Sequence, residues 1–92
     1  MTEPNRIAVI GIIIENDESV EAFNALAHSY RKIILGRMGV PCRERRISIV
    51  SLAVDGPQTE INAFSGKIGR LPGVHVKTAY ASPAADNHPG NH

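Results

Sequence analysis

The sequence is short of cysteine and nearly neutral in charge, and both features exclude classes of function. Cys42 is the single cysteine, so an intrachain disulfide and a cysteine-rich metal site within one chain are excluded. Ten Lys and Arg against nine Asp and Glu leave a net charge of +1, which gives little long-range attraction for nucleic acid or an anionic membrane. Any charged partner must therefore be recognised by a local group of side chains.

Long apolar runs and catalytic motifs are also missing. The longest apolar run, residues 7–14, falls far short of the ~20 residues that a membrane helix needs. Residues 1–5 lack the basic start of a signal peptide, so we expect no membrane contact and a cytoplasmic location. The chain has neither a phosphate-binding glycine motif nor a serine beside a histidine and acid pattern. We therefore predict no catalytic residue, no cofactor and no enzymatic activity.

The sequence does contain an ordered series of apolar segments. Residues 7–14 and 47–54 are apolar at nearly every position, which predicts two central strands that are buried on both faces. Residues 33–40 are interrupted by two glycines and residues 74–80 alternate in polarity, so these segments are predicted to be the outer strands. Residues 41–46 form a charged connection.

Two further segments show helical periodicity. The first spans residues 18–32, and either Asp17 or Ser19 is expected to accept hydrogen bonds from the N–H groups of its first turn. The second begins at Pro57, because proline suits the first position of a helix. Its predicted apolar stripe consists of Ile61, Phe64, Ile68 and Leu71.

The order βαββαβ predicts an α+β, ferredoxin-like (ACT-like) sandwich, in which a four-stranded antiparallel sheet carries two helices on one face. The domain is expected to span residues 6–81, after a lead of residues 1–5 and before a disordered tail of residues 82–92. Two helices leave the other sheet face bare, although the central strands are apolar on both. We therefore expect a homo-oligomer, a dimer or higher, that covers it.

Four segments, residues 6–15, 34–41, 47–50 and 65–80, carry a resemblance to a known family. They resemble the regulators of the iron-only hydrogenase system, which are small stand-alone proteins with an ACT-like fold related to the C-terminal domain of nickel-responsive repressors. The resemblance implies a regulatory role in hydrogenase expression or maturation. Residues 15–19 lack the Pro-Gly pair that amino-acid-binding ACT domains usually carry after the first strand, so the resemblance does not extend to amino-acid sensing.

The candidate binding residues lie in the second strand and in the connection that follows it. Arginines there could clamp a phosphate or carboxylate by paired hydrogen bonds, and glycines would let a ligand or a partner's backbone approach. A solvated hairpin, a salt-bridged dimer contact, or glycines that serve strand bulges are the alternatives. The candidates are Gly36, Arg37, Gly39, Arg43, Arg45 and Arg46.

Metal ligands are few. Cys42 and His75, joined with their symmetry mates across a dimer, could make a four-ligand site of the Cys2His2 kind. Their spacing carries no metal signature, so no metal is predicted. The acidic residues between 15 and 21 could hold a cation, although their position at a helix start is already explained by the helix dipole.

Two functions follow from these observations. The first is a non-enzymatic, oligomeric ACT-like module that binds a small-molecule effector or a protein partner at a subunit interface. The alternative is a metal- or anion-responsive transcriptional regulator that contacts DNA directly. The near-neutral charge and the missing DNA-binding motif favour the first function.

Overall fold

A computed structural model describes residues 3–82 of the chain. Its elements follow the predicted βαββαβ order, with one short 3-10 helix, η1, added before the second strand. In chain order they are β1 (Asn5–Ile14), α1 (Glu18–Ser29), η1 (Arg31–Ile33), β2 (Ile34–Cys42), β3 (Ile47–Pro57), α2 (Gln58–Gly69) and β4 (Val74–Tyr80).

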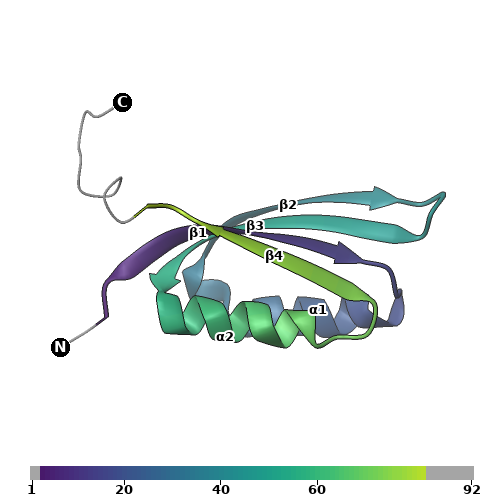
Figure 1. The fold of residues 1–92 in the computed structure, drawn as a ribbon. Coiled ribbons are helices and arrows are strands. Elements are labelled where there is room, and N and C mark those ends of the chain that lie inside the picture. Colours follow the sequence, from purple (N-terminus) through teal and green to yellow (C-terminus); the bar gives the residue numbers. More distant parts are fainter. Residues whose placement is uncertain (1–2, 83–92) are drawn as a thin grey trace, which may run out of the picture.

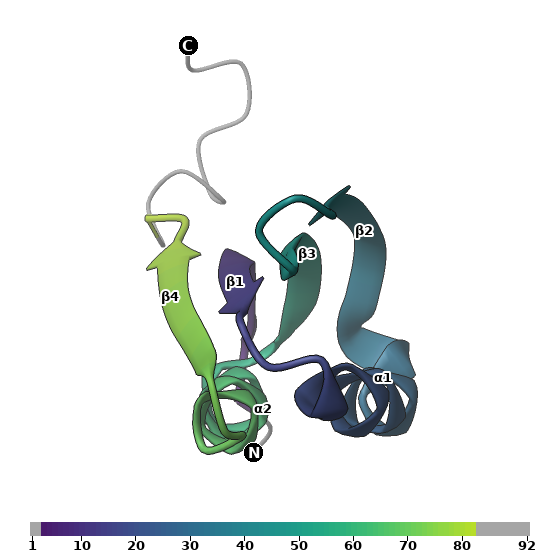
Figure 2. The same cartoon turned by 90° about the vertical axis from the view of Figure 1, so that its right-hand side faces the viewer.

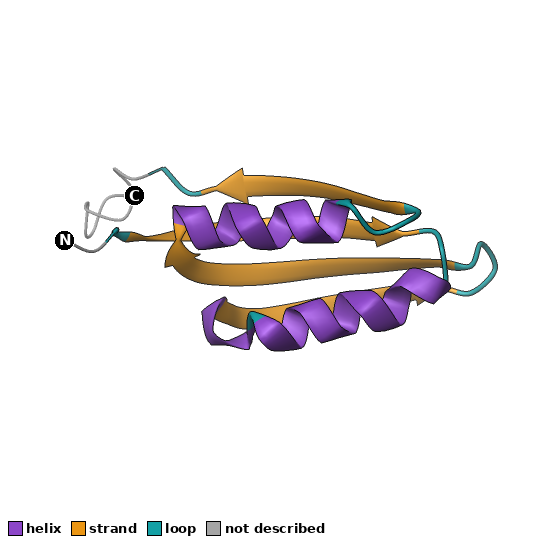
Figure 3. Ribbon diagram, turned by 90° about the horizontal axis from the view of Figure 1, so that it is seen from below, coloured by secondary structure: helices purple, strands orange, loops and turns teal. Residues whose placement is uncertain are grey.

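The four strands form one antiparallel sheet in the order β2-β3-β1-β4 (Figures 1 and 2). Both helices lie against the same face of the sheet, as the view from below shows (Figure 3). These features confirm the ferredoxin-like α+β fold. They also confirm that the first and third strands are central and that the second and fourth are outer.

The core lies between the sheet and the helices. Ile10 and Leu52 from the central strands and Phe64 from α2 are completely buried there. The ring of Phe64 stacks on that of Tyr30 with the centroids 4.4 Å apart. The predicted stripe of α2 is confirmed at Ile61, Phe64 and Ile68, whereas Leu71 follows the end of the helix and is only partly buried.

Burial of the central strands on both faces is not found within one chain. Along β1, buried residues alternate with residues that are wholly or partly exposed, and the exposed ones include the apolar side chains of Val9 and Ile13. The physical reason is that both helices pack on one side, so no described residue covers the other face of the sheet. The apolar residues predicted for that face are present and uncovered.

The first helix begins at the predicted residue, Glu18, but its N-terminal cap and its last residue differ from the prediction. The side chain of Asp17 makes no capping hydrogen bond; instead, Asn16 Oδ1 accepts from the N–H of Glu18 at 2.9 Å. Ser19 is buried, and its hydroxyl donates to the carbonyl of Pro72 at 2.6 Å, so it joins the first turn of α1 to the loop between α2 and β4 rather than capping the helix. The helix ends at Ser29 because the chain then tightens into η1.

The second helix begins one residue later than predicted. Pro57 is its N-cap in an extended conformation and still pairs with Asn5 as the last residue of β3. The free N–H of Thr59 donates to Glu3 Oε2 at 3.0 Å, and the Thr59 hydroxyl donates to Glu3 Oε1 at 2.8 Å. A carboxylate that precedes the sheet therefore caps this helix, which agrees with the favourable placement of negative charge at a helix N-terminus.

The charged connection is shorter than predicted, because β2 continues through Cys42 and pairs with β3 as far as Ile47. The turn occupies residues 43–46, and Arg46 takes a left-handed conformation with φ 57°. In Figure 3 this hairpin extends past the end of α1. The predicted tail from residue 83 onward lies outside the described residues. Between residues 3 and 82, no helix is long and apolar enough to span a bilayer.

Candidate functional site

One face of the sheet points away from both helices, and we call it the bare face. Strand register shows which residues share it, because directly paired residues point to the same side of a sheet. Its apolar members are 36–67% exposed. They are Ile7, Val9 and Ile13 of β1, Met38 and Val40 of β2, and Ile49 of β3.

The middle of the bare face lacks bulky side chains. One row of the sheet runs Met38, Ser51, Gly11, Lys77 across the four strands. The next row contains Ile49 and Ile13, so the small residues of the first row lie beside large ones. The two central positions of the row therefore form a depression beside Ile13 and Ile49.

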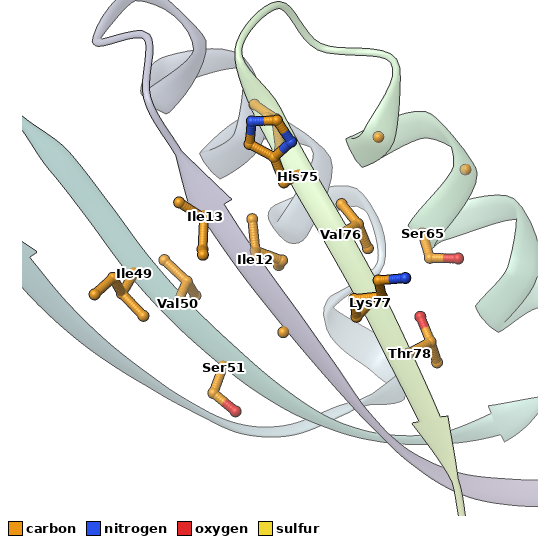
Figure 4. Close-up of a pocket in the computed structure, with 14 residues that line it drawn as sticks. Ile12, Ile13, Ile49, Val50, Ser51, Ser65, His75, Val76, Lys77 and Thr78 are labelled. Carbon is orange, nitrogen blue, oxygen red and sulfur yellow. The ribbon is translucent and has the colours of Figure 1, made fainter.

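A cavity of about 800 Å³ includes this depression, and we call it the hollow (Figure 4). Its walls come from both faces of β1, β3 and β4 and from α2, so the hollow is shared between the bare face and the side of β4 next to α2. Most of its lining is apolar or small. Ser51, Ser65 and Thr78 contribute hydroxyls, and Lys77 contributes an ammonium group.

Of the two basic side chains at the rim of the hollow, His75 has an acidic partner and Lys77 does not. His75 Nε2 lies 3.0 Å from Glu15 Oε1, and both side chains are more than half exposed, so this pair contributes little to stability. It is the single ion pair among residues 3–82. Lys77 therefore has no acidic partner within the described chain, and its charge remains available at the end of the small-residue row.

The structure divides the predicted binding residues between different surfaces. Arg37 points to the helix side, where its guanidinium lies 5.5 Å from the centre of the Phe23 ring and 3.4 Å from Asn24 Oδ1. Gly39 lies on that same side, whereas Gly36 pairs with Ala53 on the bare face and has open space around it. Arg37 and Gly39 therefore line one small pocket beside α1, whereas Gly36 lies apart from them on the other face.

The other three arginines stay together. Arg43, Arg45 and Arg46 are exposed in the β2–β3 turn, and none forms an ion pair within the described residues. Asp17 and Cys42 border a small pocket of about 270 Å³ that is also lined by Arg43 and Arg46. The turn is thus a compact basic surface near one end of the sheet.

The two candidate metal ligands lie on opposite edge strands, Cys42 on β2 and His75 on β4, with two strands between them. Neighbouring strands are spaced about 4.8 Å apart, so the two side chains of one chain are on the order of 14 Å from each other. Residues 3–82 contain no group of three or more His, Cys, Asp or Glu side chains that could hold a metal ion. A site shared between copies, which the sequence left only as an alternative, is not tested by a single chain.

A polar cluster ties the start of β1 to β4 and α2. The guanidinium of Arg6 lies 4.6 Å from the centre of the Tyr80 ring, and it donates to Gln58 Oε1 and to the carbonyl of Ala81, both at 2.9 Å. The Tyr80 hydroxyl donates to Asn62 Oδ1 at 2.6 Å. Desolvation raises the pKa of Tyr80 although the positive charge of Arg6 opposes the shift, so the phenol stays protonated near neutral pH.

Sequence reasoning did not identify Gly11, Ser51 and Lys77 as a group. One signal was available, because a glycine in the middle of an apolar, β-branched run is unfavourable in a strand. Its meaning depends on which residues lie beside it in the neighbouring strands, and that register is not readable from a single sequence.

The fold and its exposed surface define a class of protein, a single ferredoxin-like α+β domain with one uncovered apolar sheet face. Residues 6–78 match the family model described as "TM1266-like: Iron-only hydrogenase system regulator, putative". Because the match covers most of the chain, this protein belongs to that family.

A solved structure supports the assignment. The uncharacterized protein TM1266 from Thermotoga maritima is 32% identical and superimposes with a TM-score of 0.81. The alignment covers 85% of this chain and 99% of that one. A search of curated proteins found no match. The family predicted from the sequence is thereby confirmed.

Proposed function

We propose that this protein is a non-enzymatic regulatory module of the iron-only hydrogenase system. In this proposal it acts as a dimer or higher oligomer and binds an effector or a protein partner at the interface between subunits. Membership of a regulator family supports the regulatory role. The observation that carries the oligomer is the bare face, where Val9, Ile49 and Met38 are 47%, 45% and 67% exposed.

The size of the bare face suits a second copy of the chain. Four strands spaced about 4.8 Å apart and about 30 Å long present a flat area of roughly 600 Å², and relief from side chains increases the accessible surface. A standard interface buries about 800 Å² per partner, whereas scattered surface apolar residues form patches of a few hundred Å². A symmetric contact, in which the same face of each copy meets its mate, would cover the apolar residues of both.

A charge placed on the bare face tests this proposal. Val9→Lys should dissociate the oligomer because the new ammonium group would be buried against the second copy without a partner. Ala25→Lys is the matched control, since it adds the same charge on the exposed surface of α1. Light scattering after gel filtration should show a smaller mass for Val9→Lys alone. An unchanged mass for both variants would contradict the proposal, because it would show that the bare face is not the interface between subunits.

The exposed arginines of the β2–β3 turn favour a second candidate, a regulator that contacts DNA directly. Arg43, Arg45 and Arg46 lie together without ion pairs in the described chain, and such groups bind phosphates. The net charge of +1 argues against strong non-specific binding. A gel-shift assay at low salt separates the candidates, because only the second predicts a complex with duplex DNA that weakens as salt is added.

A further inference from the structure

Gly11 has no structural reason to be glycine within its own chain. It lies in the centre of β1, and its pairing with Ser51 and Lys77 continues without a bulge. A Cβ atom added at Gly11 would meet only the backbone oxygen of Lys77 at 3.7 Å, which is an ordinary contact. Glycine weakens a strand, and one that is not needed for a bend commonly marks a close approach by a ligand or by another backbone.

The surroundings of Gly11 indicate what approaches it. The hollow, which is shared between the bare face and the side of β4 next to α2, has a volume of about 800 Å³. This is more than one side chain from a second copy would fill, and it is within the range of small-molecule sites. Its walls are mainly apolar, with Ile13 and Ile49 on one side of the small-residue row. Lys77 is the cation at the end of the row, and the neighbouring His75 is already engaged by Glu15.

We propose that the hollow binds an amphiphilic monoanion, a small molecule with an apolar body and one anionic group. The body lies over Gly11 and Ser51 against the neighbouring isoleucines, and the anionic group pairs with the ammonium group of Lys77. The inference rests on the proposed function in that it names the effector class and places its site on the interface-forming face. A second copy across the bare face would then enclose the bound molecule.

Two fluorescent probes with the same aromatic body test the site. 8-Anilinonaphthalene-1-sulfonate carries an anionic group, and N-phenyl-1-naphthylamine does not. The native protein should bind the sulfonate more tightly. Lys77→Gln should weaken sulfonate binding about fivefold, the effect of losing one partly exposed ion pair, and should change binding of the neutral probe less than about twofold. Lys32→Gln, a control on the exposed surface of η1, should change neither.

Gly11→Val tests the position of the apolar body. Valine suits a strand and the added Cβ has room, so the melting temperature should not fall, whereas both probes should bind more weakly because the side chain occupies the space over Gly11 where the apolar body lies. The proposal is overturned if Lys77→Gln affects both probes equally or neither, or if Gly11→Val leaves both unchanged. It is also overturned if Gly11→Val dissociates the oligomer, because that result would show that a second copy of the chain, and not a small molecule, occupies the space over Gly11.

Sedimentation of the same samples separates the two proposals. An oligomer without preference for the anionic probe would contradict the monoanion site alone. A monomer that keeps the preference, and loses it in Lys77→Gln, would contradict the proposed assembly and leave the site standing.

Discussion

Truncation of Phe64 tests the packing of α2 against the sheet. The side chain is completely buried, and its ring stacks on Tyr30 at 4.4 Å, so Phe64→Ala removes a whole ring from the centre of the core. Such truncations cost about 3–5 kcal/mol. A domain of this length is stable by only about 0.05–0.15 kcal/mol per residue, so the loss is a large fraction of the total free energy of unfolding.

The effect is measurable by urea or thermal unfolding followed by circular dichroism at a fixed protein concentration. A loss of that size should lower the melting temperature by at least about 12 °C in a domain of fewer than 100 residues. Leu71→Ala is the control, because Leu71 belongs to the same stripe but is only partly buried, and it should cost less than half as much. An equal fall in melting temperature for the two variants, or no fall for Phe64→Ala, would refute this description of the core.

Two further predictions concern charged residues. Glu3→Gln should lower the melting temperature at pH 7, because the carboxylate of Glu3 caps α2. Hydrogen bonds from the side chain and then the backbone of Thr59 lower the pKa of Glu3, so this stabilisation is present above about pH 4.3 and is lost as the pH falls through the lowered pKa. Wild type and variant should converge in acid melts; a gap that persists there would contradict the capping role. Replacing Arg43, Arg45 and Arg46 with alanine should weaken tripolyphosphate binding in calorimetry while stability moves by within about 0.5 kcal/mol. Loss of the oligomer with phosphate binding intact would assign these arginines to assembly.

Much of the fold was predictable because periodicity reports the environment of each segment. The apolar runs of residues 7–14 and 47–54 correctly predicted central strands, and the alternation in residues 74–80 correctly predicted an edge strand. The buried stripe of α2 followed from helical spacing alone. Periodicity does not show whether the layer that covers an apolar face belongs to the same chain. It therefore did not reveal that the second face of β1 is uncovered within one chain.

The differences at the element ends have local causes. Asn16 accepts the N-terminal hydrogen bond of α1 that the sequence assigned to Asp17 or Ser19, and Glu3 caps α2, for which the sequence predicted only a proline at the start. The bonds of Glu3 with Thr59 join residues that are distant in sequence. Spacing rules apply within one element and do not reach such pairs.

The candidate site was less predictable than the fold. Arg37 and the arginines of the turn are close in sequence, yet alternation along β2 and the following turn place Arg37 on the helix side and the others at the hairpin. Conversely, Gly11 and Lys77 are far apart in sequence and adjacent across two paired strands. Sheet register, which joins such residues, is the information that was missing.

Sedimentation equilibrium of the wild-type protein at ~100 μM, a concentration that populates even weak complexes, tests the central claim most directly. The bare face predicts a dimer or a larger assembly under these conditions, because a monomer would leave its apolar strands in water. A well-folded monomer at this concentration, with a cooperative melt, would contradict the claim.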